Sequence, residues 1–167
     1  GSGVFPTAEP ARAELVSRID KLFIPDPENK GAAPIDDYSM RFNFKPKIAS
    51  HFDLTQYQKI GIKGRSLGSE EIKIQIAFIT RKGATAGALV NLKKNGSAVV
   101  IERSELRPVD FVILPRPYPS FLPYFHTNDV PFNWGEIETI QISVGPGMTE
   151  EERQNSWSLA IESIWLE

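Results

Sequence analysis

The segment 71–80 alternates apolar and polar residues, and this pattern constrains the fold more than any other feature of the sequence. Every second residue is a large apolar one: Ile72, Ile74, Ile76 and Phe78. The residues between them face the other way: Lys73, Gln75 and Ala77. Because side chains alternate across a strand, the period of two predicts a β-strand over Glu71–Thr80, with one face on a core and one toward water.

Shorter alternating segments recur from Tyr38 onward, separated by glycine, proline and polar turn residues. They are Met40-Phe42-Phe44, Ile60-Ile62 and Ile140-Ile142-Val144, the last opposed by Thr139, Gln141 and Ser143. Short strands at this spacing are typical of β-sandwiches and barrels. The sequence therefore predicts an all-β domain.

Two short motifs predict how the chain turns between strands. Asn95-Gly96 separates the apolar runs 88–92 and 97–101, and an Asn-Gly pair favours a β-hairpin closed by a type I′ turn. Thr149 followed by Glu152 fits a capping box, which predicts one or two helical turns between two strands.

The stretch 11–24 fits a helix by the spacing of its apolar residues and a strand by its apolar end. Segment 19–24 has the same character as the end of the chain, 161–166, which favours two similar strands. Gly1-Ser2-Gly3 reads as a cloning remnant with no signal peptide after it, so we expect any targeting segment to have been removed. We expect 4–36 to form a strand or extension packed on a β-sandwich at 37–167, one domain overall.

Composition excludes several classes of partner. With 167 residues, 41% hydrophobic and 24% charged, the chain fits one soluble core. A net charge of −2 provides no basic field for nucleic acid, and no apolar run approaches the about 20 residues of a membrane span. The chain has no cysteine, so thiolate metal sites and cysteine nucleophiles are absent.

The proline-rich, aromatic stretch 107–134 reads as a long ordered loop, and such loops are commonly functional. Its aromatic and polar side chains form our predicted ligand site: Tyr118, Tyr124, Trp134, Arg116 and His126. Aromatic faces stack on the C–H faces of sugar rings, and the polar tips add hydrogen bonds. The alternative is that the loop aromatics only pack on the sandwich, the reading we prefer for Phe121, Phe125 and Phe132.

Polar residues on the faces opposite the apolar ones are further candidates. They are Arg41, Asn43, Lys73, Gln75, Asn91 and Gln141. Such side chains can bind sugar hydroxyls or a uronate carboxylate, but an ordinary solvated sheet face is the reading we prefer for each of them taken singly. Trp157 alternates with Leu159 and Ile161 and is expected in the core, whereas Trp165 alternates with Ser163 and faces outward or covers an edge.

The order of three segments resembles the galactose-binding-domain-like superfamily, which includes many carbohydrate-binding modules. The segments are 52–64, 99–108, and 137–142 together with 158–166. The resemblance implies a jelly-roll β-sandwich of two antiparallel sheets. The layout is also similar to domains related to the complex I intermediate-associated protein, which bind proteins. Where family modules carry a tryptophan platform, this chain has Val99-Val100-Ile101, which argues against a sugar platform at that point.

No cofactor is predicted from the residues themselves, but the resemblance implies a structural Ca²⁺ near the chain ends. Oxygen ligands available there are Asp20, Asp26, Glu28 and Glu162, and charged solvated loops explain the same residues.

A self-sufficient enzyme is not expected. Glu136 and Glu138 are similar to the acid pair of jelly-roll glucanases, but Gln141 stands where the second carboxylate would be needed. The two histidines, His51 and His126, are 75 positions apart and have no metal-ligand spacing. A lyase using Tyr124 and His126 would also need a partner that neutralises the uronate.

The sequence thus favours a non-catalytic carbohydrate-binding module, or an ancillary β-sandwich of a larger polysaccharide-active or cell-surface protein. Its expected partners are a polysaccharide or oligosaccharide and neighbouring domains of the parent chain, with an extracellular, cell-surface or periplasmic location. A structural spacer or protein-interaction domain is the alternative. A jelly-roll glycoside hydrolase or polysaccharide lyase is the third reading.

Overall fold

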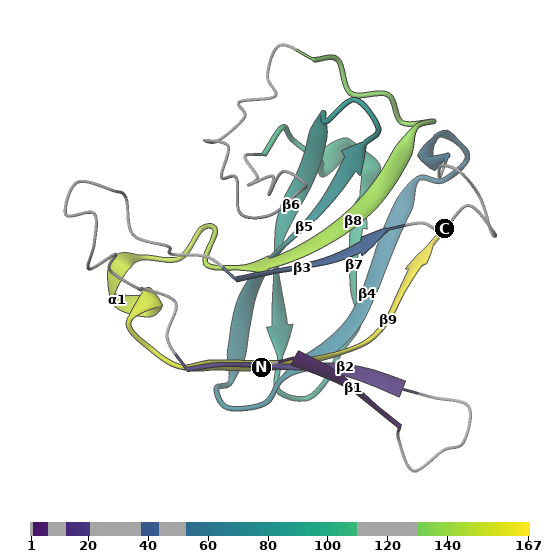
Figure 1. Ribbon diagram of the computed structural model, residues 1–167. Coiled ribbons are helices and arrows are strands. Elements are labelled where there is room, and N and C mark those ends of the chain that lie inside the picture. The colour runs from purple at the N-terminus through teal and green to yellow at the C-terminus, as the bar shows by residue number, and fades with distance from the viewer. Residues whose placement is uncertain (1, 7–12, 21–37, 44–52, 110–129) are drawn as a thin grey trace.

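The strands form two antiparallel sheets that face one another, as the computed structural model shows (Figure 1). The structure describes residues 2–6, 13–20, 38–43, 53–109 and 130–167. One sheet has five strands, in the order β1 (Ser2–Pro6), β2 (Ala13–Ile19), β9 (Trp157–Leu166), β4 (Lys59–Ser66) and β7 (Val99–Glu102). The other has four, in the order β3 (Tyr38–Asn43), β8 (Ile137–Val144), β5 (Glu71–Thr80) and β6 (Thr85–Lys93). The predicted jelly-roll sandwich is confirmed.

The core lies between the sheets and follows the predicted alternation. Strand β5 has the predicted bounds, and its four inward apolar side chains are fully buried: Ile72, Ile74, Ile76 and Phe78. The facing sheet contributes further buried side chains: Ile60, Ile62, Leu159 and Ile161. Trp157 packs against this core, as expected from its spacing.

Strand β2 resolves the ambiguity of stretch 11–24 in favour of a strand. It pairs with β9 through Leu15↔Ile161 and Ile19↔Trp157, so every second side chain faces the core. The inward Ser17 is fully buried and donates its hydroxyl to Met40 Sδ at 2.9 Å, across to the other sheet. Pairing with β9 overrides the helical spacing, and residues 21–24 of the stretch lie outside the described residues.

The predicted hairpin around Asn95-Gly96 is wrong, because β6 and β7 belong to different sheets. Among the described residues only glycines have positive φ, so Asn95 cannot occupy a type I′ turn, whereas Gly96 has φ +74°. The Asn95 side chain instead accepts hydrogen bonds from the amide and hydroxyl of Ser97, at 3.0 and 2.7 Å. Strand β6 forms its hairpin with β5, from Glu71↔Lys93 to Ile79↔Thr85.

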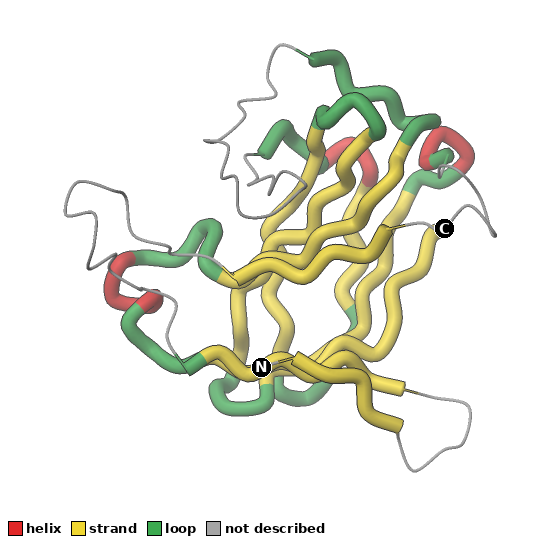
Figure 2. Tube along the Cα trace, viewed as in Figure 1, coloured by secondary structure: helices red, strands yellow, loops and turns green. Residues whose placement is uncertain are grey.

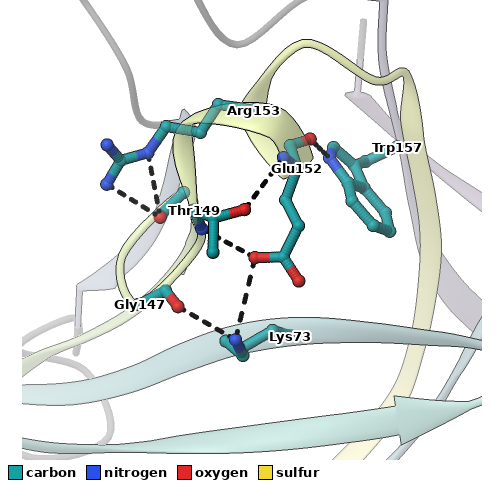
Figure 3. Close-up of polar contacts among 7 residues, drawn as sticks. Lys73, Gly147, Thr149, Glu152, Arg153 and Trp157 are labelled. Carbon is teal, nitrogen blue, oxygen red and sulfur yellow. Dashed lines mark hydrogen bonds and ion pairs between the residues drawn. The ribbon is translucent and has the colours of Figure 1, made fainter.

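Short helical turns lie at strand ends (Figure 2): η1 (Leu54–Gln56), η2 (Arg103–Glu105) and α1 (Glu150–Arg153). The predicted capping box begins α1: the Thr149 hydroxyl accepts from the Glu152 amide at 3.2 Å, and the Glu152 carboxylate accepts from the Thr149 amide at 2.7 Å (Figure 3). None of the helices in the described part is long and apolar enough to cross a membrane.

Candidate functional site

The centre of the outer face of the four-stranded sheet is buried, although it points away from the core. Sequence alternation predicts a solvated face there, yet Gln75 is only 7% exposed, and Gln141 and Ser143 are each 1% exposed. Register brings side chains of all four strands together, because Ser39 pairs with Ser143, Ser143 with Gln75, and Gln75 with Leu89. We call this row, with Arg41 and Gln141 beside it, the outer-face site. A buried polar face of this kind forms a candidate binding site.

A hydrogen-bond network fixes one half of the outer-face site. The Gln141 side chain accepts from Arg41 Nε at 2.5 Å and donates to the hydroxyl of Ser143 at 3.0 Å and that of Ser39 at 3.3 Å. The two serine hydroxyls are 2.7 Å apart. Because Arg41 and Ser39 are exposed at the sheet edge, the network leads from the buried centre of the face to solvent.

Gln75 occupies the other half of the outer-face site and differs from Gln141 in its hydrogen bonding. In the described part of the chain its amide makes no hydrogen bond, although the side chain is 93% shielded from solvent (7% exposed). No fully shielded side-chain nitrogen or oxygen among the described residues lacks a partner, so the Gln75 amide must still reach solvent. Buried polar groups are normally hydrogen-bonded, and a buried stem with an open polar tip is an arrangement suited to a ligand.

An apolar side chain lies next to Gln75. Leu89 is 50% exposed on the outer face of β6, directly opposite Gln75 in the register. Gly147, in the turn before α1, lies over Leu89, since a Cβ on Gly147 would fall 2.5 Å from Leu89 Cδ1. The row therefore combines polar tips with an accessible apolar contact.

The α1 turn forms a wall at this end of the outer face (Figure 3). Lys73 Nζ donates to the Gly147 carbonyl at 2.9 Å and lies 3.8 Å from the Glu152 carboxylate. Arg153 holds the start of the turn through the Gly145 carbonyl, and the Trp157 indole donates to the Glu152 carbonyl at 2.9 Å. These contacts join β5, the turn and β9, so the wall is anchored to both sheets.

Small residues form the floor beside the polar row. Ala77 is fully buried, and a Cβ on its neighbour Gly87 would fall 2.6 Å from the Ile76 carbonyl oxygen. Gly87 also pairs with Arg107, which fixes the chain that follows β7 against the edge of β6. Next to it, the Thr85 hydroxyl donates to the Val109 carbonyl. The chain thus enters segment 110–129 beside this face.

Only one of the five predicted ligand residues can be located. Tyr118, Tyr124, Arg116 and His126 lie outside the described residues. Trp134 is half-buried and packs against the core, edge-on to Phe132 with ring centroids 4.6 Å apart. Its other neighbour is Arg103, whose guanidinium carbon lies 5.7 Å from the ring centroid. Phe132 packs against the core, as expected.

The structure shows the surroundings of several acidic residues that the sequence raised as catalytic or calcium-binding candidates. Glu138 is exposed, and Gln141 belongs to the outer-face network. Of the proposed calcium ligands, Glu162 is ion-paired with Lys63 at 3.2 Å and Asp20 is exposed, while Asp26 and Glu28 lie outside the described residues. The described residues contain no group of three or more His, Cys, Asp or Glu suited to a metal. Asp20 and Glu162, the two candidates that can be located, are therefore not part of such a group.

Solved structures with the same arrangement decide the fold. A family 11 carbohydrate-binding module from Clostridium thermocellum, in complex with a β-1,3-1,4-mixed-linked tetrasaccharide, aligns over 99% of this chain and 81% of its own, with TM-score 0.58 and 13% identity. The family 11 module of a cellulosomal cellulase from the same organism aligns with TM-score 0.57 and 12% identity, over 99% and 79%. The chain therefore has the same β-sandwich fold as these two modules.

The same module fold also occurs within a much larger protein. An exo-β-agarase aligns with TM-score 0.51 and 10% identity, over 98% of this chain but only 22% of its own. No family model matches the sequence, and no curated protein matches it either. The likeness therefore lies in the fold and not in the sequence.

Sequence reasoning found part of the outer-face site and missed the rest. Alternation identifies Arg41, Gln75 and Gln141 as polar residues opposite apolar ones, but it does not indicate that they lie together. Ser39, Ser143 and Leu89 were not selected, because only strand register places them beside Gln75. Alternation reveals which face a residue occupies, but it contains no information on the neighbour across the ladder.

Proposed function

We propose that this chain is a non-catalytic carbohydrate-binding module that binds an oligosaccharide or polysaccharide at the outer-face site. The observation that carries the proposal is Gln75, a buried side chain whose amide has no hydrogen-bond partner in the described part and still reaches solvent. The fold shared with a module solved with a bound tetrasaccharide supports it.

The chemistry of the site matches sugar hydroxyls, which both donate and accept hydrogen bonds. An amide offers a donor and an acceptor on one planar group, and Gln75 carries that group on the outer face. The network through Gln141 holds Arg41 and the two serines in fixed positions, so little ordering is needed on binding. Leu89 supplies an apolar contact for the C–H face of a ring.

The aromatic loop completes the proposed site. Tyr118 and Tyr124, together with Arg116 and His126, would add stacking and hydrogen bonds where the chain leaves Val109 beside the outer face. Trp134 would contribute through its accessible part only, because the rest of the indole packs against the core. We further propose an exported location and a larger polysaccharide-active parent, in line with the agarase in which this fold is a minor part.

The test is binding of two soluble probes, a β-1,3-1,4-mixed-linked tetrasaccharide and an agarose-derived tetrasaccharide, measured by isothermal titration calorimetry. We expect one of them to bind, and the change Gln75→Leu to weaken its binding at the outer-face site at least about tenfold, the effect of losing about 1.4 kcal/mol. Gln58→Leu, at an exposed position outside the site, is the matched control and should bind as the wild type does.

Two results would contradict the proposal. Absence of binding to either probe would favour the structural-spacer or protein-interaction alternative. Sustained release of reducing ends from either probe would show that the chain is a glycoside hydrolase.

A further inference from the structure

The outer face of the five-stranded sheet carries an aromatic platform on the opposite side of the molecule from the outer-face site (Figure 1). Gly61 on β4 pairs with Trp165 on β9 and with Val100 on β7, so these three residues form one row across the sheet. A Cβ on Gly61 would fall 2.1 Å from Trp165 Cε2, so the indole lies directly over the glycine. The missing side chain at Gly61 lets the ring lie against the sheet.

The Trp165 indole lies on the outside of the sheet and does not pack against the core. Trp134 and Trp157 are among the described side chains that pack against the core, and Trp165 is not. Its indole Nε1 donates to Glu167 Oε1 at 2.8 Å, in an exposed hydrogen bond, which fixes the ring orientation from the polar edge. Val100 beside it is 48% exposed. Trp165 and Val100 thus give this row an apolar surface that solvent can reach.

A polar hollow of about 160 Å³ adjoins the platform farther along the same face. It is lined by Glu14, Lys63, Gly64, Arg65, Asn95, Gly96 and Glu162. A β-bulge between Lys63 and Gly64 inserts Glu162 as an extra residue in β9, which turns its carboxylate toward Lys63. Bulges often redirect side chains at binding sites. Lys63 and Gly64, on either side of this irregularity, and the Asn95-Gly96 turn all line the hollow.

The charges of the hollow are balanced. Lys63 pairs with Glu162 at 3.2 Å, and Arg65 pairs with Glu14 through both guanidinium nitrogens. Two carboxylates facing two cations leave no net field that would select an anion or a cation. They do offer many acceptors and donors for a neutral ligand rich in hydroxyl groups.

We propose that this face is a second carbohydrate-binding surface, with Trp165 stacking one sugar ring and the adjoining hollow binding hydroxyls of another. Arg65 lies four residues from Gly61 along β4, a distance of about 13 Å, so the ligand is a neutral oligosaccharide of more than one ring. The inference rests on the proposed function, in that the same class of ligand is assigned to both faces. A glycan could then bridge two copies, or one copy could hold two chains.

The experiment follows each face separately by NMR on the intact chain, with the two tetrasaccharides named above as probes. The indole N–H signal of Trp165 is assigned from the variant Trp165→Phe, and the side-chain amide of Gln75 from Gln75→Leu. We expect the Trp165 signal to shift on titration in the wild type and in Gln75→Leu. In Gly61→Ala the new methyl group must displace the indole, so the shift should be lost.

A matched control separates displacement of the ring from a general effect of alanine. Gly68→Ala adds a methyl group where no other heavy atom lies within 4 Å, and it should leave the Trp165 shift unchanged. Circular dichroism on all variants checks that each one is folded.

The outcomes distinguish the two proposals. A shift of Gln75 alone would overturn the second surface and leave the outer-face site standing. A shift of Trp165 alone would support the second surface and contradict the outer-face site, and a shift of neither signal with either probe would overturn both. A shift of the Trp165 signal on raising the protein concentration without glycan would assign the face to self-association and overturn the second surface.

Discussion

Two glutamines on the same face of the four-stranded sheet should respond oppositely to the same substitution. Gln75 and Gln141 are both more than nine-tenths buried, and neither points into the core. Gln141 makes three hydrogen bonds, to Arg41, Ser39 and Ser143, whereas Gln75 makes none in the described part of the chain. Changing each to leucine compares an amide that holds internal hydrogen bonds with one that holds none among the described residues.

The magnitudes follow from these contacts. Each hydrogen bond of Gln141 is worth roughly 0.5–1.5 kcal/mol net, and water can replace part of the bonds at exposed Arg41 and Ser39. We therefore expect Gln141→Leu to lower the free energy of unfolding by about 2 kcal/mol. Gln75→Leu loses no internal hydrogen bond and buries more apolar surface. We therefore expect its free energy of unfolding to stay the same or to rise by up to about 1 kcal/mol.

Urea unfolding followed by tryptophan fluorescence would measure both variants against the wild type. In thermal unfolding, a chain of this size changes its melting temperature by about 2–4 °C for each kcal/mol of stability, so the melting temperatures of the two variants should differ by roughly 4–12 °C. Equal losses of stability in the two variants would refute the reasoning, because Gln75 would then have an internal partner. Gln75→Leu should keep the fold and lose glycan binding at the outer-face site, the trade between stability and function often seen at binding sites.

Three further substitutions test the surrounding structure, each by urea unfolding with the wild type alongside. Gly87→Ala should lower the free energy of unfolding by about 2 kcal/mol, because its methyl group would meet the backbone of β5. An unchanged stability would mean that β5 and β6 can move apart easily. Arg103→Met should lower the free energy of unfolding by about 2 kcal/mol, since one guanidinium nitrogen donates to three carbonyls around η1 at 3.0 Å. No loss of stability would show that water replaces the guanidinium as the donor to these carbonyls. Thr149→Ala should cost about 1 kcal/mol by removing the cap of α1, with Thr149→Ser retaining it.

The strands of the sandwich were predictable because alternation is a local property of the sequence. Glu71–Thr80 was predicted with its observed bounds, and so was the capping box at Thr149. The hairpin at Asn95-Gly96 failed for a physical reason: a turn motif determines that the chain reverses, but not which sheet the next strand joins. Strand β6 pairs with β5 over its whole length, and β7 joins β4 in the other sheet.

The candidate sites divide in the same way. Composition and alternation alone determined an all-β chain without a basic field. They placed Gln75 on a face turned away from the core, and Trp165 either facing outward or covering an edge. Only the tertiary structure decided that Gln75 lies buried beside Ser143 and Leu89, and that Trp165 lies over Gly61. Period two assigns a side chain to a face of its own strand, whereas its neighbours are set by pairing between strands far apart in the sequence.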